Sequence, residues 1–243
     1  MHSLYAAGGE QPAGLSLCAD QYLVLDGVVV DSVRLVVDVC PDVEDDETLF
    51  QTLRSWKTML DHHNANTREG GEGARLIETD EFVDTLGGDA LRVWTVLTRY
   101  IGSPPPEYSR PRDAGRRFRP LDRGWWQMSV QQESQPPEAW KHHLDGVVRR
   151  TTRRSRFFIT DWGRTGLGPA GLIPSDVVFV ARGGELPLIL RSASTGASGI
   201  GVPNCVHNGP PLCSLVGPAY VSGVMDGEAL ADANDALMSV HIG

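Results

Sequence analysis

The β-forming sequence of this chain lies in two parts, separated by a long stretch with helical patterns. Residues 22–37, YLVLDGVVVDSVRLVV, are rich in Val and Leu, and the pair Asp26-Gly27 suits a turn or a bulge, so two strands or one bent strand fit equally. Residues 156–225 alternate short β-rich runs with turn sequences such as Asp-Trp-Gly and Pro-Ser-Asp. Because short strands cannot each bury a face alone, both parts are expected to meet in one small sheet or barrel.

The stretch between these parts carries helical periodicity. A stripe of large apolar residues at spacings of four, three and four predicts a helix after the acidic run PDVEDDE. The stripe consists of Leu49, Leu53, Trp56 and Leu60. Residues 79–88, TDEFVDTLGG, predict a short helix with a glycine stop, and further helices are expected at 91–101 and 136–154.

The predicted fold class is α+β, with a small discontinuous β-barrel or sheet from about 22–37 and 156–225 and a helical insertion at about 48–155. The expected organisation is a poorly ordered N-terminus at 1–20 followed by one α+β unit at 21–243. The parts of that unit are a β part at 21–40 and 156–230 and a helical part at 48–155 with a Pro/Arg-rich connection at 102–137.

Charge is distributed unevenly along the chain. The net charge of -9 argues against a global attraction to nucleic acid or to an anionic membrane. Residues 110–156, however, hold eleven Arg and one Lys against five acids, which is 12 - 5 = +7. This segment could bind RNA, or it could form solvated helix faces and internal ion pairs. The second interpretation is favoured because no stacking-aromatic motif accompanies the arginines, so nucleic acid is not the expected partner.

Cysteine usage and hydropathy bear on the compartment. Cys18, Cys40, Cys205 and Cys213 show no CxxC pairing, and the first residues lack a signal-peptide pattern. No apolar run reaches the ~18–20 residues that a membrane-spanning helix needs. A cytoplasmic protein with reduced thiols and no membrane contact is therefore expected.

Known catalytic spacings are not found: the sequence contains no GxxxxGK[ST], HExxH or GxSxG pattern, so no catalytic residue and no cofactor is expected. Cys205, His207 and Cys213 are the candidate metal ligands, although a zinc site normally needs a fourth ligand. The pairs His62-His63 and His142-His143 are expected to be exposed, because adjacent helical side chains point about 100° apart.

Two acids follow the last apolar run, at Asp226 and Glu228 with one glycine between them. A metal site, an acid/base pair and a turn all fit this spacing. The turn is favoured because Asp-Gly is a turn pair and Glu228 can open the short helix EALADA. Asp226 would then be a capping acceptor. A small metal-dependent enzyme that uses these acids with Cys205 and His207 is the remaining alternative.

Two phrases near the C-terminus carry a family resemblance. RFFITDWGRTGLGPAGLIPSDVVFVARGGELPLILR resembles the phrases R-x-F-F-x-T-x-x-G, G-L-G-P, G-D-x-V and P-x-x-L-R, and LVGPAYVSGVMDGEAL resembles a closing phrase Y-x-L-V-G-x-x-Y-V-x-G-x-M-x-G-E. With these phrases the chain resembles the C-terminal region of fungal heterokaryon-incompatibility (HET-domain) proteins. It departs from them at Ser175, where the family usually has glycine, at Cys213 or Ser214, where an aromatic often precedes the Leu-Val-Gly, and in the unusually long loop at 192–211.

The resemblance covers most of residues 20–230 and leaves out the HET domain itself. It implies a non-enzymatic accessory or interaction region of a fungal self/non-self recognition protein, with a protein partner. The matched positions are expected to be structural. They are Phe158, Thr160, Gly163, Gly166, Gly168, Pro169, Asp176, Pro187, Leu190, Arg191, Gly217, Tyr220, Gly223, Met225, Asp226, Gly227 and Glu228.

Overall fold

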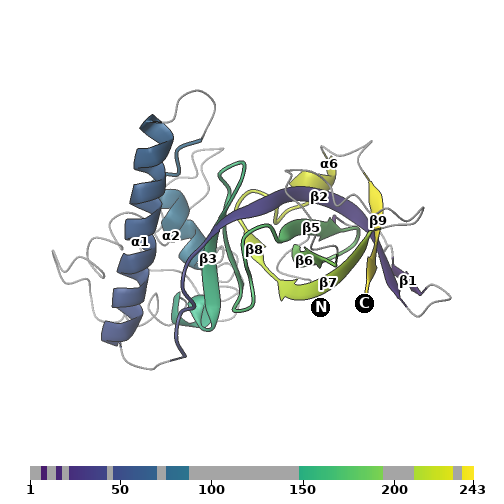
Figure 1. Cartoon of the computed structure of the whole chain (residues 1–243), viewed down its shortest axis with the longest axis horizontal. Helices are drawn as coiled ribbons and strands as arrows, with labels where there is room; N and C mark the ends of the chain where they lie inside the picture. The colour runs from purple at the N-terminus through teal and green to yellow at the C-terminus, as the bar shows by residue number, and fades with distance from the viewer. Residues whose placement is uncertain are drawn as a thin grey trace, which may run out of the picture. The chain divides into compact units, whose positions relative to one another are not determined.

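The structure is a computed structural model that describes most of the two β parts and the first helices (Figure 1). The described residues are 7–9, 15–17, 22–42, 46–69, 75–87, 148–193, 211–231 and 237–243. The chain divides into two compact units, of which the first comprises Met1–Ile77 and Arg153–Gly243 and the second Glu78–Thr152. The candidate site lies in the first unit.

The first unit is built on a nine-stranded sheet whose strands come from both β parts of the sequence. The strands are β1 (Leu15–Leu17), β2 (Leu23–Val36), β3 (Ser155–Thr160), β4 (Thr165–Pro169), β5 (Val177–Ala181), β6 (Leu188–Ser192), β7 (Leu212–Pro218), β8 (Tyr220–Val221) and β9 (Met238–Ile242). Their order is β5-β6-β7-β9-β2-β3-β4-β8, with β1 on β2. The expected α+β class and the meeting of both β parts in one sheet are confirmed.

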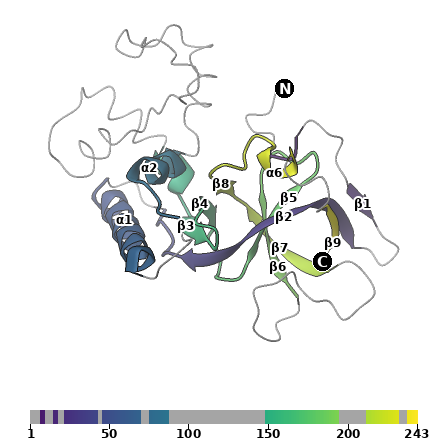
Figure 2. The same ribbon diagram turned by 90° about the horizontal axis from the view of Figure 1, so that it is seen from above.

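β2 is the strand that joins the two ends of the chain. It is antiparallel to β9 over 23–27, to β5 over 27–32 and to β3 over 33–36. The register shifts between Val29 and Asp31 and again between Val33 and Leu35, and such bulges bend a strand. Of the two readings left open by the sequence, the structure shows one bent strand, which crosses the unit in Figure 2.

The pairings close on themselves, because β5 pairs with β2 as well as with β6. The resulting ring is β2-β5-β6-β7-β9, and β7 and β9 are parallel. A hydrophobic cluster takes one side chain or more from every strand of this ring. Its buried members are Leu25, Phe179, Ala181, Leu190, Cys213 and Val240.

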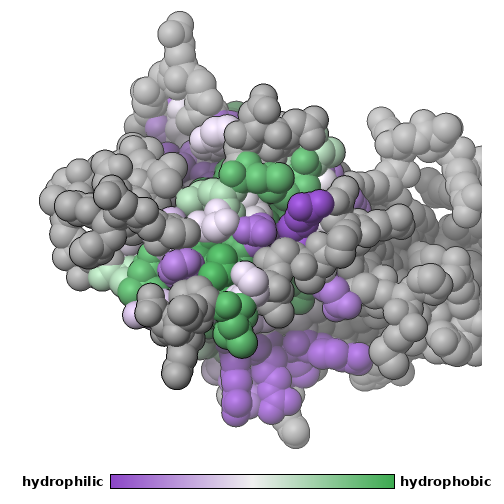
Figure 3. Space-filling model, turned by 90° about the vertical axis from the view of Figure 1, so that its right-hand side faces the viewer, coloured by the Kyte–Doolittle hydropathy of each residue, from purple (hydrophilic) through white to green (hydrophobic). Residues whose placement is uncertain are grey.

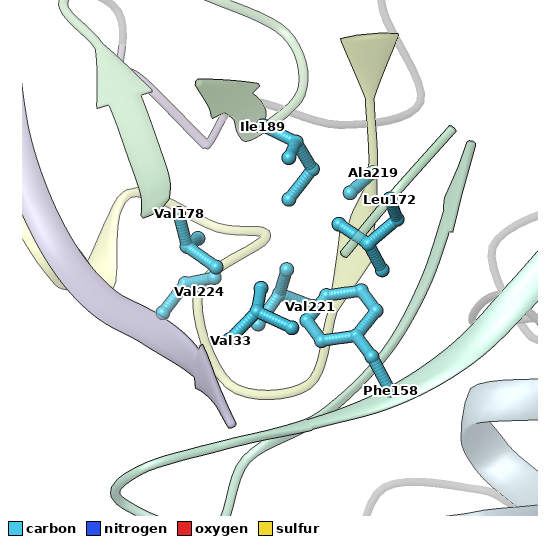
Figure 4. Close-up of a cluster of buried hydrophobic side chains, with 8 residues drawn as sticks. All are labelled: Val33, Phe158, Leu172, Val178, Ile189, Ala219, Val221 and Val224. Atoms are coloured by element: carbon cyan, nitrogen blue, oxygen red, sulfur yellow. The ribbon is translucent and has the colours of Figure 1, made fainter. Parts of the chain in front are cut away.

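A second hydrophobic cluster uses residues that alternate with those of the first along β5 and β6. Val178 and Ile189 alternate with Phe179 and Leu190, so they point to the opposite face of the strands. There they meet β3 and β8 (Figure 4). The cluster consists of Val33, Phe158, Leu172, Val178, Ile189, Ala219, Val221 and Val224. Two layers therefore share the strands β5 and β6.

The helix α1 (Asp46–Glu69) bears out the predicted stripe, whose four residues are at most 2% exposed. Trp56 stacks on Phe157 of β3 with ring centroids 6.0 Å apart, and its Nε1 donates a hydrogen bond of 3.1 Å to Asp38 O. The helix thus packs on the face of β3 opposite to Phe158.

The second unit contains α2 (Thr79–Gly87), which confirms the predicted short helix, and the helical residues 148–152. Thr151 Oγ1 donates hydrogen bonds to Leu86 O and Val148 O. The helix expected at 91–101, most of that at 136–154 and the connection at 102–137 lie outside the described residues. In the part of the chain that the structure describes, no helix is long and apolar enough to cross a membrane.

Candidate interaction site

The hairpin turn between β3 and β4 presents a tryptophan on a closely hydrogen-bonded loop. Thr160 N–H donates to Arg164 O at 2.9 Å, and Gly163 N–H donates to Thr160 O at 3.0 Å. The Thr160 hydroxyl, which is fully buried, accepts a bond of 3.0 Å from Arg164 N–H. Gly163 has φ 75°, a value that suits glycine. Thr160 and Gly163 are both matched positions, and both shape this turn.

The carboxylate of Asp31, which is only 7% exposed, ties the turn to β2. One of its oxygens accepts a bond of 2.8 Å from Ser32 N–H, and the other accepts a bond of 3.2 Å from Trp162 N–H. Asp161 N–H donates to Ser32 O at 2.9 Å. A buried carboxylate needs such donors, because an unsatisfied charge in the interior is destabilising. The backbone at Trp162 is therefore held by the hydrogen bonds within its own turn and by Asp31 and Ser32 of β2.

The side chain of Trp162 itself is 73% exposed. Gly163 lies beside Arg75, so the connection after α1 reaches this turn, and the adjacent Leu76 is 42% exposed. An exposed Trp on a fixed backbone loses little conformational entropy on binding, and Trp is enriched among residues that dominate protein interfaces. The arrangement is suited to anchoring a protein partner.

A second turn, Ile173–Asp176, explains two of the matched phrases. Asp176 N–H donates to Ile173 O at 3.3 Å, Pro174 is the second residue and Ser175 has φ 74°. This is the pattern of a type II turn, whose third position favours glycine. The serine thus stands at a left-handed position where the resembling family has glycine.

Asp176 connects this turn to β6. Its carboxylate is 1% exposed and accepts two bonds of 2.8 Å from Arg191, from Nε and from Nη2, and one of 2.9 Å from Ile173 N–H. Arg191 Nη2 also donates to Gly171 O at 2.7 Å. The hydrogen bonds to Asp176 raise the pKa of the Arg191 guanidinium above its ordinary value, despite its partial desolvation. The phrases G-D-x-V and P-x-x-L-R therefore meet in one ion pair.

The closing phrase forms a turn that starts a short helix. Gly227 has φ 85°, and α6 (Glu228–Ala231) begins at Glu228, as the sequence predicted. Glu228 Oε2 accepts a bond of 2.6 Å from Asp226 N–H. Met225 is buried, and its sulfur accepts a bond of 3.4 Å from Val221 N–H. The predicted role of the Asp226 side chain as a capping acceptor stays a prediction.

Of the candidate metal ligands, Cys205 and His207 lie outside the described residues. Cys213 is a buried thiol in the ring cluster, where it lines an apolar cavity of about 10 Å³ with Val29 and Met238. That volume is close to the lower limit for one water molecule. Among the residues that the structure describes, no three His, Cys, Asp or Glu side chains are grouped so that they could hold a metal ion.

The arginine-rich segment is described only at its C-terminal end. Arg153 and Arg154 both form ion pairs with Asp42. The hydrogen bond from Arg153, followed by the charges of both arginines, lowers the pKa of Asp42 below 3.8. These two arginines therefore agree with the interpretation that arginines of this segment form ion pairs within the fold. Arg110 to Lys141 lie outside the described residues.

Two further exposed leucines lie at opposite ends of the part of the sheet that carries β1 and β9. Figure 3 shows hydrophobic side chains there between hydrophilic ones. Leu17 is 77% exposed and Leu237 is 51% exposed. Both adjoin segments outside the described residues, 18–21 and 232–236, and no site is assigned to them.

No family model, no curated protein and no solved structure matches this chain. The candidate site therefore rests on the geometry of its own residues. Sequence reasoning identified Asp-Trp-Gly as a turn but missed the exposure of Trp162 and the role of Asp31. Asp31 and Trp162 are 131 residues apart, so their contact leaves no local signal.

Proposed function

We propose that the chain is a non-enzymatic interaction region of a fungal heterokaryon-incompatibility type protein, and that it binds a protein partner through the turn carrying Trp162. The exposed Trp162 on its hydrogen-bonded turn carries the interaction part of the proposal, and the Ile173–Asp176 turn carries the family part. Its third residue takes φ 74° at the position where the resembling family has glycine, and its last residue pairs with the arginine of the next family phrase. A left-handed position in this chain where the family usually has glycine is consistent with the glycine being required by the turn, and this supports the resemblance.

The matched positions hold backbone, core and turns together. Gly163, Gly223 and Gly227 have φ of 75°, 77° and 85°. Phe158 is fully buried in the second cluster, and Gly166 packs against its ring. These structural roles support the interpretation of the matched phrases as a family signature for a fold and for an interaction surface. We also propose that the closed ring of strands, which surrounds its own hydrophobic cluster, is the small barrel expected from the sequence.

The test is photo-crosslinking through position 162 in an extract of the organism that makes the protein. A photoreactive phenylalanine analogue replaces Trp162 in the full chain, and the matched control carries it at Ser55 of α1, which is also exposed. The proposal expects a cross-linked protein that contains a HET domain, formed from position 162 and absent from position 55. The same products from both positions, or none from position 162, would reject the interaction site.

The non-enzymatic part has its own test. The intact mass of the native protein, captured with an antibody against GVMDGEAL, shows whether a HET domain precedes this region, and 26.4 kDa is the mass of the chain alone. A hydrolytic or transfer activity of the purified chain that Asp226→Asn abolishes, with folding intact, would overturn the assignment.

A further inference from the structure

Residues Ala7–Gly9 lie in a groove formed by the β5–β6 hairpin, β2 and α6. The backbone of Gly8 is hydrogen-bonded to the loop of this hairpin: its N–H donates to Gly184 O at 2.7 Å, and its carbonyl accepts from Gly183 N–H at 2.9 Å. Ala7 N–H adds a longer bond of 3.3 Å to Glu185 O. Backbone hydrogen bonds of this kind contribute affinity in peptide recognition while leaving specificity to the side chains.

The side chain of Ala7 fills the apolar part of the groove. It is fully buried and clusters with Val28 of β2 and Val180 of β5. Ala229 and Leu230 of α6 pack against the same cluster. α6 starts directly after Gly227, so the closing MDGEAL phrase supplies one wall of the groove. The enclosed space favours a methyl group, since a larger side chain would overpack it.

The groove selects glycine at the next position. A Cβ on Gly8 would lie 2.1 Å from Ala181 O and 2.3 Å from Gly184 N, both of them backbone atoms. No rotamer change relieves a clash with backbone. Gly9 has open space around it but takes φ 69°, a left-handed value that also favours glycine. The fit therefore depends on the order small residue, glycine, glycine.

We propose that this groove is a binding site for a short peptide turn with an alanine followed by two glycines, and that residues 7–9 of the chain occupy it as an internal ligand. Three residues of the segment make these contacts, and hydrogen bonds and apolar packing alone hold them in the groove. A partner that carries the same sequence would make the same contacts once the internal segment leaves. A tethered ligand has a high effective concentration, so the internal segment competes with any external peptide. This inference does not rest on the proposed interaction through Trp162.

The experiment measures binding of the labelled peptide SLYAAGGEQP, which is residues 3–12, to the full chain. In the full-length variant Gly8→Val the internal segment cannot seat, so the peptide is expected to bind it with one-to-one stoichiometry. Wild-type protein is expected to bind the peptide at least about tenfold more weakly, because its groove is occupied. The control peptide, with valine in place of the same glycine, is expected to bind neither protein.

Hydrogen exchange gives a second readout on the same proteins. In wild type the Gly183 amide should be protected, because it donates to Gly8 O. It should exchange faster in the Gly8→Val variant and regain protection when the peptide is added. If that variant does not fold, Ala7→Glu, which expels the segment by burying a charge, replaces it. A folded variant that does not bind the peptide, or a wild-type Gly183 amide without protection, overturns the proposal.

Discussion

Arg191 and Asp176 are joined by two hydrogen bonds, each 2.8 Å long, between the guanidinium and a carboxylate that is 1% exposed. Two parallel bonds of this kind fix both the distance and the orientation of the partners. They link the turn before β5 to the end of β6, and the same guanidinium also holds Gly171 O. The pair thus orders the chain between two neighbouring strands.

Replacing Arg191 with alanine should lower the free energy of unfolding by about 2–3 kcal/mol, because it leaves the buried carboxylate with Ile173 N–H as its remaining described donor. The effect should be smaller than for a fully buried pair, since the Arg191 side chain is 37% exposed. Urea unfolding of the full chain measures the change.

The control is Arg150→Ala, at an exposed helical position. It should leave the urea midpoint nearly unchanged. In the double variant Asp176→Ala with Arg191→Ala, the loss should be smaller than the sum of the two single losses, because the two residues interact directly. Additive losses would contradict the ion-pair role.

Ser175→Gly should stabilise the protein. A non-glycine residue at φ 74° is strained by about 1–2 kcal/mol, and the greater freedom of glycine in the unfolded chain offsets about 0.5–1 kcal/mol of the gain. The net increase in the free energy of unfolding should be about 0.5–1 kcal/mol. Ala170→Gly, at a nearby position without a positive φ, should change the stability in the opposite direction. A loss of stability in Ser175→Gly would count against strain at this turn.

The part of the fold that could be predicted from the sequence was predicted from local periodicity. The Leu49–Leu60 stripe predicted α1, because residues one turn apart must share a face. The strands β1 and β9 were not predicted, because three and five residues carry too little pattern, and the partner of β9 is also distant in the sequence. They form only because β2 offers both edges between Leu23 and Leu25.

The candidate site was predictable only in its turns. The turns at Gly163 and Gly227 can be predicted from the local sequence, because turn glycines and their neighbours form short motifs. The anchoring of Trp162 by Asp31 depends on the bend of β2, and no local rule contains that bend. His63 makes the same point: it was expected to be exposed with His62, but tertiary packing leaves it half-buried.

Gly166→Ala should destabilise the protein by about 1–3 kcal/mol through overpacking. A Cβ at this position would lie 2.3 Å from Phe158 Cζ and 2.6 Å from Tyr220 O, and Phe158 has no free space in its buried cluster. Gly171→Ala is the matched control, because its nearest neighbour would be Val216 Cγ1 at 3.7 Å. Thermal unfolding should separate the two variants, and equal midpoints would contradict the close packing at Gly166.

His63 should make the protein less stable in mild acid. Its burial, and then the charge of Arg34, lower its pKa below 6.5. Between this lowered pKa and 6.5, the unfolded chain binds a proton that the folded chain does not, so the free energy of unfolding falls as the pH falls. Above the unfolded pKa both states are neutral, and the full stability is retained.

The unfolding midpoint of wild type should therefore drop between about pH 7.5 and about pH 5.5, and His63→Gln should show a smaller drop. Arg34→Gln should reduce the drop by less, because the charge of Arg34 is the smaller cause and burial remains. The exposed His62, changed to glutamine, should leave the drop as it is in wild type. An equal drop in wild type and His63→Gln would show that the acid sensitivity arises elsewhere, because the two proteins differ only in the side chain at residue 63.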